Sequence, residues 1–525
     1  MFPDALAYSQ LQNGVHRDLL LFVPELALCA GIVVSLVSRL LPKRFQANAT
    51  SYGLVAAGIG FAWVAVQWLA YSDGIGGAEA FGSLLRFDAF ACFFRGFLLL
   101  FLLLALVLTR ITGIPDADDS ADFTVLLLGG ILGMMLMSSA NHLLIAFLAI
   151  EMASLPSYVL AGFLKGKSKG SESALKYVVY GAAASGVMLY GISLLAGRFG
   201  SGHLPTLMAG YADLLKTGGI DLPLATGTLF LLCGLGFKLA AVPFHFWLPD
   251  VFEGAAPEVG AVLAVASKAA AVALMFRLLQ ALYAAFGFVS PFVFAETIGV
   301  AIAVLAAITA TVGNLAALGQ TNVKRLLGYS TIAHAGYMLM ALATCKPAAG
   351  AALLFYLIGY MLMTLGAFAV VAIVRNRTGS ENVTAFRGLI ARSPILGISM
   401  AIFLLSLLGL PPLAGFAGKF ALFAAVYRTG AEYTAAGHPW LGTLFTILLG
   451  VGVLNAVLSA GYYLKLIKII GFDESNECDE KGNAHSLGHS TAAAIFVGVL
   501  AVLTVAAGLA WDPLMNLAKI ATTVR

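Results

Sequence analysis

The sequence predicts an all-α integral membrane protein with about 14 transmembrane helices, because a span needs about 20 apolar residues and such runs recur along the chain. Hydrophobic residues make up 60% of the 525 residues, and charged residues make up only 11%. Soluble proteins contain roughly 45–50% apolar and about 25% charged residues, and the mean hydropathy of this chain is +0.94. No segment alternates polar and apolar residues with a period of two, which argues against a β-barrel.

The apolar runs define the expected spans in order. We expect helices over residues 19–41, 51–71, 88–111, 122–139, 142–164, 174–197, 224–248, 259–285, 293–317, 327–345, 349–374, 394–427, 440–471 and 489–511. The run 394–427 is too long for one straight span and contains Pro411 and Pro412, so we expect a broken helix there. Pro243 predicts a second break, in the run 224–248.

These spans are expected to form one polytopic membrane domain over residues 1–525. It divides into spans 1–3 (1–121), a first repeat (122–290), a second repeat (291–472), and a polar loop with the last span (473–525). Interrupted segments at corresponding places in two halves are typical of transporters built from internal repeats. With five helices in each repeat, spans 9–13 would be inverted relative to spans 4–8.

The distribution of basic residues predicts the orientation of the chain. The loops on the side of the first loop carry 16 Lys and Arg residues, and the opposite loops and the termini carry eight. Cytoplasmic loops are enriched in Lys and Arg. Both termini are therefore expected on the outer side, as an even number of spans requires.

Other classes of protein are excluded by composition and by missing motifs. The net charge of +4 is too weak and too dispersed for a nucleic-acid-binding patch. None of the five cysteines has C-x-x-C spacing, so a zinc, thiol-redox or c-type haem site has no support. Glycine-rich nucleotide motifs are absent as well. The polar N-terminal segment argues against a cleavable signal peptide.

Four ionisable residues lie inside predicted spans: Glu151, Lys238, Lys268 and Lys419. A charge at the bilayer centre costs about 2.5–3.5 kcal/mol on insertion scales, so each is a functional candidate by default. A purely structural interpretation stays open for three of them. Glu151 would join two helices by a hydrogen bond, and Lys238 would extend its amine toward the membrane interface. Lys268 would belong to a structural ion pair. Lys238 and Lys419 each accompany a predicted helix break, which is tolerated where it lines a watery cavity.

Three further residues are weaker relay candidates. His245 follows Lys238 by seven residues, about 10 Å along an unbroken helix, so a water bridge would be needed. His334 lies in a predicted span beside Ser330 and Thr331, and either connects the lysines or joins helices. Lys176 lies near the inner end of its span and either passes protons or reaches toward the interface.

Several long segments resemble one known family. FHFWLPDVFEGAAPEVGAVLAVASK (244–268), NLAALGQTNVKRLLGYSTIAHAGY (314–337) and GLPPLAGFAGKF (409–420) are similar to the antiporter-like membrane subunits of respiratory complex I. EMASLPSYVLAGF (151–163) and SESALKYVVYGAAAS (171–185) match as well. The lysine at position 419 and the F-H-F-W sequence resemble the N-type subunits of bacterial NADH–quinone oxidoreductase.

The resemblance implies proton translocation coupled to NADH oxidation and quinone reduction in other subunits. It implies that Glu151 and Lys238 form a modulating ion pair, that Lys268 is the central relay lysine, and that Lys419 faces the outlet or the neighbouring subunit. NADH, FMN, iron–sulfur clusters and quinone would belong to partner subunits, with no cofactor in this chain. The partners would be other membrane-arm subunits in the bacterial inner membrane, with both termini of this chain periplasmic.

Three alternatives remain open at this stage. A subunit of a multi-subunit Na⁺/H⁺ antiporter would share the fold and the lysines. A membrane scaffold with an inactive channel is disfavoured, because idle charges in lipid are costly. A haem-binding helical bundle would use His142, His245 or His334, but no sequence pattern pairs these histidines.

Overall fold

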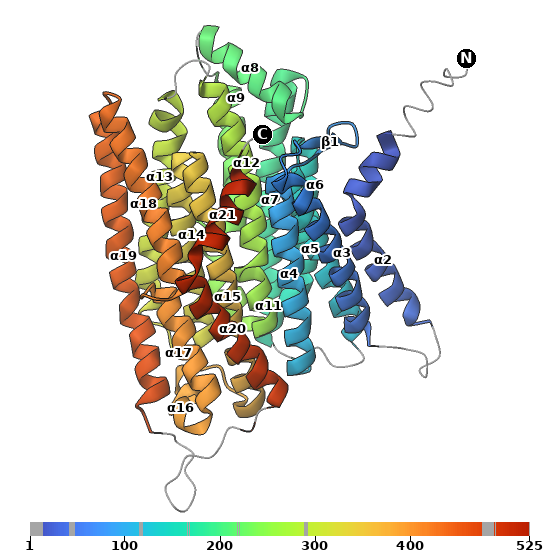
Figure 1. The fold of residues 1–525 in the computed structure, drawn as a ribbon, viewed down its shortest axis with the longest axis vertical. Helices are drawn as coiled ribbons and strands as arrows, with labels where there is room; N and C mark the ends of the chain where they lie inside the picture. The colour runs from blue at the N-terminus through green and yellow to red at the C-terminus, as the bar shows by residue number, and fades with distance from the viewer. Residues whose placement is uncertain are drawn as a thin grey trace, which may run out of the picture.

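The computed structural model describes residues 14–40, 48–114, 119–164, 166, 168–217, 219, 221–287, 292–474, 488 and 490–523. Most of the acidic loop 473–480 and both chain termini lie outside these residues. The described chain is a bundle of long helices that run roughly side by side (Figure 1). An all-α membrane protein with many spans is confirmed.

The helices and strands follow the predicted runs closely. Their bounds are α2 Val23–Ser38, α3 Ala49–Ser72, β1 Ala78–Ala80, β2 Leu85–Phe87, α4 Ala89–Thr112, α5 Ser120–Ser139, α6 Leu143–Ala161, α7 Ser168–Phe199, α8 Leu204–Thr217, α9 Leu222–Leu239, α10 Trp247–Gly254, α11 Pro257–Ala264, α12 Ala266–Gly287, η2 Ala295–Gly299, α13 Val300–Ala317, α14 Val323–Thr344, α15 Pro347–Thr378, η3 Val383–Phe386, α16 Leu389–Arg392, α17 Pro394–Leu408, α18 Ala414–Ala435, α19 Pro439–Gly471, α20 Thr491–Leu509 and α21 Trp511–Thr522.

Within the described ranges, 12 helices are long and apolar enough to cross a membrane, or 13 if the bent pair Gly14–Leu21 and Val23–Ser38 is one span. The expected number was about 14, since each needs about 20 apolar residues. The run 394–427 accounts for part of the difference, because α17 has only 15 residues and α18 is a separate helix. The total of 14 spans stays a prediction.

Helices α8 and α21 and one hairpin are among the elements that were not expected from the sequence. Strands β1 and β2 form a short antiparallel hairpin between α3 and α4, with Ala78 opposite Phe87. Its apolar residues Ala80, Leu85 and Phe87 are buried in a small cluster of their own. Three-residue strands are too short to produce a recognisable alternating pattern.

Local chemistry explains where several helices begin and end. The Asp88 side chain accepts a hydrogen bond from the Ala91 N–H at 2.8 Å and so caps the start of α4. That helix ends at Gly113, which has a left-handed φ of 70°. α15 likewise ends at Gly379, with Arg375 and Arg377 in its last turn, where basic residues interact favourably with the helix dipole.

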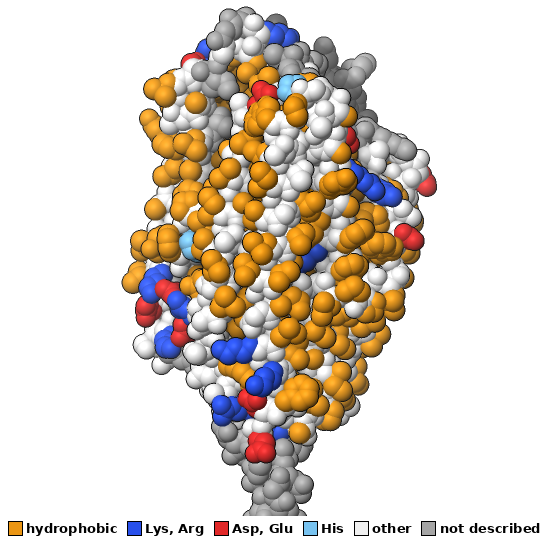
Figure 2. All heavy atoms as spheres, turned by 90° about the vertical axis from the view of Figure 1, so that its left-hand side faces the viewer, with side chains coloured by type: hydrophobic (Ala, Val, Ile, Leu, Met, Phe, Trp, Pro, Cys, Tyr) orange, Lys and Arg blue, Asp and Glu red, His pale blue; other side chains and the backbone are white. Residues whose placement is uncertain are grey.

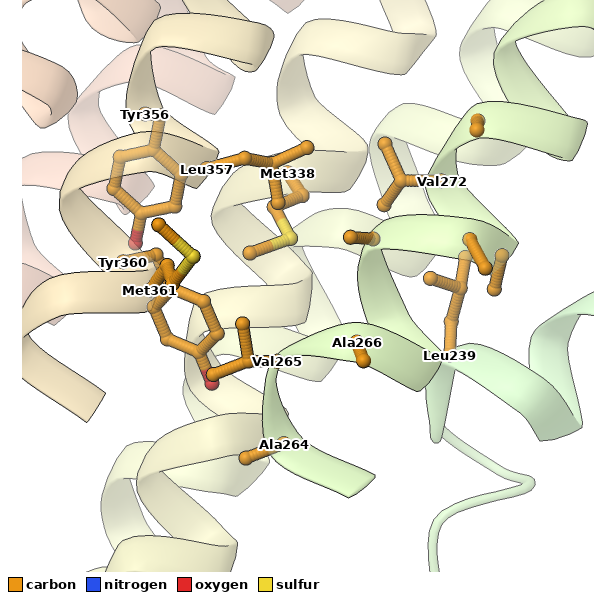
Figure 3. Packing of buried hydrophobic residues seen from close by; sticks show 14 of the residues in the cluster. Leu239, Ala264, Val265, Ala266, Val272, Met338, Tyr356, Leu357, Tyr360 and Met361 are labelled. Carbon is orange, nitrogen blue, oxygen red and sulfur yellow. The ribbon is translucent and has the colours of Figure 1, made fainter. Parts of the chain in front are cut away.

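The centre of the bundle is formed by α11, α12, α14 and α15, which are almost completely buried. Figure 3 shows the junction of α11 and α12 at Val265 beside Tyr360 and Met361 of α15. The peripheral helices α3, α7 and α19 expose much of their apolar surface. Hydrophobic side chains cover most of the face in Figure 2, and many of its charged side chains gather toward its lower end. An apolar belt of this kind suits a bilayer.

Candidate functional site

Lys238 lies where a membrane helix is interrupted. α9 ends at Leu239, the next residue Ala240 has a left-handed φ of 53°, and α10 begins only at Trp247. The Lys238 side chain is buried, and its Nζ donates a hydrogen bond to Ser154 Oγ of α6 at 2.8 Å. Ser154 in turn donates to the Ile150 carbonyl at 2.6 Å. The lysine is therefore held in the interior and does not reach toward an interface.

Glu151 lies one turn before Ser154 on α6 and is half-buried. Its carboxylate accepts a hydrogen bond from the Ser185 hydroxyl of α7. No direct ion pair joins it to Lys238 in the described part of the chain, because the lysine amine is bonded to Ser154 instead. The ion pair implied by the resemblance is therefore not formed at contact distance among the described residues.

Lys268, in the first turn of α12, is 1% exposed. Its Nζ donates to the Leu239 carbonyl at 3.0 Å and to the Thr331 carbonyl at 2.6 Å. The Leu239 carbonyl is available because the last carbonyls of a helix have no partner within the helix. Among the described residues Lys268 forms no ion pair, and both of its acceptors are backbone carbonyls.

Lys419 is held in a similar way at the second interruption. α17 ends at Leu408, and the buried Lys419 Nζ donates to the Leu407 and Leu408 carbonyls at 2.8 and 3.0 Å. The amine also lies 4.8 Å from the centre of the Tyr337 ring on α14. Both central lysines therefore use carbonyls at the end of a broken helix as acceptors.

His334 lies between these lysines, on the buried helix α14. One ring nitrogen is hydrogen-bonded to the Tyr356 hydroxyl, and the other lies 3.3 Å from the Tyr463 hydroxyl. Tyr360, whose ring packs 5.2 Å from the His334 ring, donates to Thr331 Oγ1 at 3.3 Å. Hydroxyl and imidazole groups thus occupy the space between Lys268 and Lys419.

The other two relay candidates lie elsewhere. His245 is in the turn between α9 and α10, so it does not continue the face of Lys238 as an unbroken helix would require. It is 7% exposed, and its Nδ1 has no hydrogen-bond partner among the described residues. Lys176 is partly exposed and pairs with Glu172 and with Asp250, each at 2.7 Å. The structure brings Lys176 into a surface charge network and not to the central lysines.

Two buried ion pairs were missed or undervalued in the sequence. Arg95 of α4 donates from Nε to Glu25 of α2 at 2.7 Å, and both side chains are almost fully buried. Arg277 forms a two-pronged pair with Asp88 at 2.9 and 3.0 Å. Burial raises the pKa of Asp88, but the Arg277 guanidinium has the opposite effect, and the net result is a pKa below the usual range. The signal for Arg95 was a lone arginine in an apolar run.

A further charged cluster connects the first turns of α11 and α14 with the end of α15. Lys324 pairs with Glu381 at 2.8 Å, and Arg375 lies 3.5 Å from Glu258. Both bases were treated only as loop residues in the sequence. In the sequence, Lys324 and Arg375 lie near the ends of predicted helices, where basic residues are expected to be exposed. Their burial could not be predicted from these positions.

The three lysines do not border the cavity found beside Asp88 and Arg277. Among the described residues, no group of three or more His, Cys, Asp or Glu side chains is placed to hold a metal ion. A cavity of about 480 Å³ lies near the Asp88–Arg277 pair, bordered by α4, α12 and α21. The arrangement of buried amines, hydroxyls and imidazole is suited to moving protons, since each group can gain and release one.

Comparison with known proteins agrees with this interpretation. Residues 140–446 match the family described as NADH:quinone oxidoreductase/Mrp antiporter, TM. NADH-quinone oxidoreductase subunit N of Anaeromyxobacter sp. (strain Fw109-5) is 37% identical over 95% of this chain and 96% of its own length. Subunit N 2 of Sorangium cellulosum (strain So ce56) is 40% identical, over 94% and 95%.

A solved structure extends the likeness to the fold. A chain of respiratory complex I from Thermus thermophilus with bound aureothin has a TM-score of 0.74 and 33% identity, and the match covers 94% of this chain and 99% of that one. Together the matches span nearly the whole sequence. The chain belongs to the NADH:quinone oxidoreductase/Mrp antiporter family, in the group of its N-type subunits.

Proposed function

We propose that this chain is a proton-translocating membrane subunit of a bacterial NADH:quinone oxidoreductase. The observation that carries the proposal is the row of buried amines Lys238, Lys268 and Lys419, with His334 and tyrosine hydroxyls between the last two. Buried ionisable groups inside a membrane are costly and are retained for function. The relatives that support the proposal are named as subunits N of this oxidoreductase.

The proposed route follows the hydrogen bonds. Glu151 lies beside Ser185 and one turn from Ser154, which contacts Lys238. Lys238 is adjacent to Leu239, whose carbonyl holds Lys268. We assign Glu151 and Lys238 to modulation, Lys268 to the centre of the relay, and Lys419 to its far end. His245 would act through water, and Lys176 would hold Asp250 in place.

The energetics of such a relay are moderate. Moving one proton against 100 mV costs about 2.3 kcal/mol. Each hydrogen bond that a lysine ammonium donates to a carbonyl contributes about 1.5–3 kcal/mol, so making or breaking one of them is of this order. Displacing one charge along the row can therefore shift the next proton, and redox energy from partner subunits would drive the displacement.

The remaining assignments extend this proposal to the whole chain. We infer 14 spans with inverted repeats at spans 4–8 and 9–13, within one domain divided at about residues 121, 290 and 472. The termini would be periplasmic and the inner loops cytoplasmic. No redox centre is assigned to this chain, so NADH, FMN, iron–sulfur clusters and quinone would be bound by partner subunits. The partners would be other membrane-arm subunits, because the matched relatives are named as subunits of such an oxidoreductase.

The test is made on the assembled complex. A tagged chain is purified in mild detergent and assayed for NADH–quinone reductase activity, and inverted membrane vesicles are assayed for NADH-driven proton uptake. Lys238→Ala should lower turnover and proton uptake together, and Glu151→Gln should do so more mildly. Lys346→Ala, which removes a partly exposed amine that pairs with Glu432, serves as the matched control.

The outcomes distinguish a subunit of an NADH:quinone oxidoreductase from a subunit of a Na⁺/H⁺ antiporter. Full pumping by Lys238→Ala would contradict the role of this lysine. A complex of membrane subunits without NADH activity, and with sodium-dependent proton flux, would instead identify a multi-subunit Na⁺/H⁺ antiporter.

A further inference from the structure

Glu258, the second residue of α11, has a carboxylate that accepts no hydrogen bond from the described residues. The side chain is buried, and neither oxygen is hydrogen-bonded to any atom of the described residues. The nearest ion-pair partner is Arg375 Nη2 of α15, at 3.5 Å, and Nη1 of the same guanidinium also lacks a partner among them. Buried polar groups are nearly always hydrogen-bonded, so this exception needs a physical explanation.

The groups around Glu258 connect it to the surface. Lys324 of α14 donates to the Ala255 carbonyl at 2.6 Å, three residues before Glu258, and pairs with Glu381 at 2.8 Å. Glu381 is partly exposed, whereas Lys324 is almost fully buried. Two acids and two bases thus form a neutral cluster that begins at the surface and ends at Glu258. Among the described residues, α4, α6, α10 and α12, which also pack on α11, supply no ion-pair partner to it.

Three polar side chains on α15 are spaced between this cluster and the surroundings of Lys268, without a continuous chain of hydrogen bonds. Glu258 and Lys268 are ten residues apart, about 15 Å along the helical axis, which is too far for direct proton transfer. α15 packs against α11, and Tyr360, Thr364 and Arg375 recur at intervals of four and 11 residues, which places them near one side of α15. Tyr360 donates to Thr331, whose own carbonyl accepts from Lys268.

We propose that Glu258 is a proton-loading residue that carries protons from the inner surface to Lys268. This inference rests on the function proposed above. In the first step a hydronium ion at the cluster gives up a proton, and an O–H bond forms on the Glu258 carboxylate. In the second, that O–H bond breaks and an N–H bond forms on the neutral Lys268 amine, through water and the hydroxyls along α15. The carboxylate is then restored beside Arg375.

The experiment compares Glu258→Gln with wild type in the assembled oxidoreductase. Glutamine keeps the shape of the side chain but cannot carry a proton. NADH-driven proton uptake should fall by about tenfold or more near pH 8. The loss should be smaller near pH 6, because abundant hydronium ions partly replace the missing group. Glu432→Gln makes the same chemical change at an exposed residue and should leave the rates unchanged.

Parallel variants separate the possible failures. If Lys268→Ala abolishes pumping while Glu258→Gln matches Glu432→Gln at every pH, the inference is overturned and the proposed function stands. If Lys268→Ala pumps normally, the proposed function itself fails. If the Glu258→Gln complex does not assemble, Glu258→Asp decides the matter. Its carboxylate is one methylene shorter, so slower pumping at alkaline pH supports the inference, and unchanged pumping in an assembled complex overturns it.

Discussion

Replacing Glu25 by glutamine removes the negative charge from the ion pair that joins α2 and α4. Arg95 makes four hydrogen bonds there: two to the Glu25 carboxylate, at 2.5 and 2.7 Å, one to Gln67 and one to the Leu21 carbonyl. The two paired side chains are 0% and 1% exposed. The glutamine would leave a buried guanidinium without a counter-charge, a change that costs about 3–5 kcal/mol.

The double variant Glu25→Gln/Arg95→Met makes the prediction specific. With neither charge present, most of the lost stability should return, and the unpaired Gln67 should cost about 1 kcal/mol. The assay is thermal unfolding of the purified complex with Glu432→Gln as control, an exposed pair worth about 0–1 kcal/mol. Our reasoning is refuted if Glu25→Gln melts like wild type, or if the double variant is no more stable than the less stable single variant.

Two further predictions concern other parts of the bundle. Gly415→Ala would place a methyl group 1.7 Å from the Ser406 carbonyl oxygen, so we expect the approach of α18 to α17 to be lost and Lys419-dependent pumping to fall, as measured by proton uptake in vesicles. The ion pair of Asp88 with Arg277 should stabilise the protein fully at pH values above the ordinary aspartate pKa of about 3.9. This stabilisation should disappear as the pH falls through the lowered pKa of Asp88 in the folded state. Asp88→Asn should therefore lower the melting temperature at neutral pH and have little effect under strongly acidic conditions.

The helices could be predicted from the sequence because the bilayer imposes a simple requirement on each span. About 20 apolar residues are needed, and the chain supplies such runs one after another. The hairpin β1–β2 was missed, because its strands of three residues contain no measurable period. The bend between Gly14–Leu21 and Val23–Ser38 was missed as well, although Pro24 stands in the first turn of α2.

The site could be predicted only in part, for a different reason. The lysines Lys238, Lys268 and Lys419 are conspicuous in apolar runs, and the structure places all three in the interior. Lys238 bonds to the Ser154 hydroxyl. The partners of Lys268 and Lys419 are the carbonyls of Leu239, Thr331, Leu407 and Leu408, which every residue type possesses. Which carbonyl accepts a hydrogen bond from a lysine depends on where the helices end and on which helices pack against the lysine. Sequence spacing contains neither piece of information.

This choice of partner has a consequence for proton transfer. A carboxylate 4 Å from a lysine contributes about 4 kcal/mol at an effective dielectric constant of 20, which exceeds the roughly 2.3 kcal/mol needed to move a proton against 100 mV. Direct contact would add this charge–charge attraction to the hydrogen bonds and hold the proton more tightly on the lysine. Carbonyls at the ends of α9 and α17 stabilise the ammonium through hydrogen bonds without a full negative charge. The Ser154 hydroxyl likewise accepts from Lys238 without a full negative charge. A broken helix next to each central lysine thus keeps the proton bound but transferable.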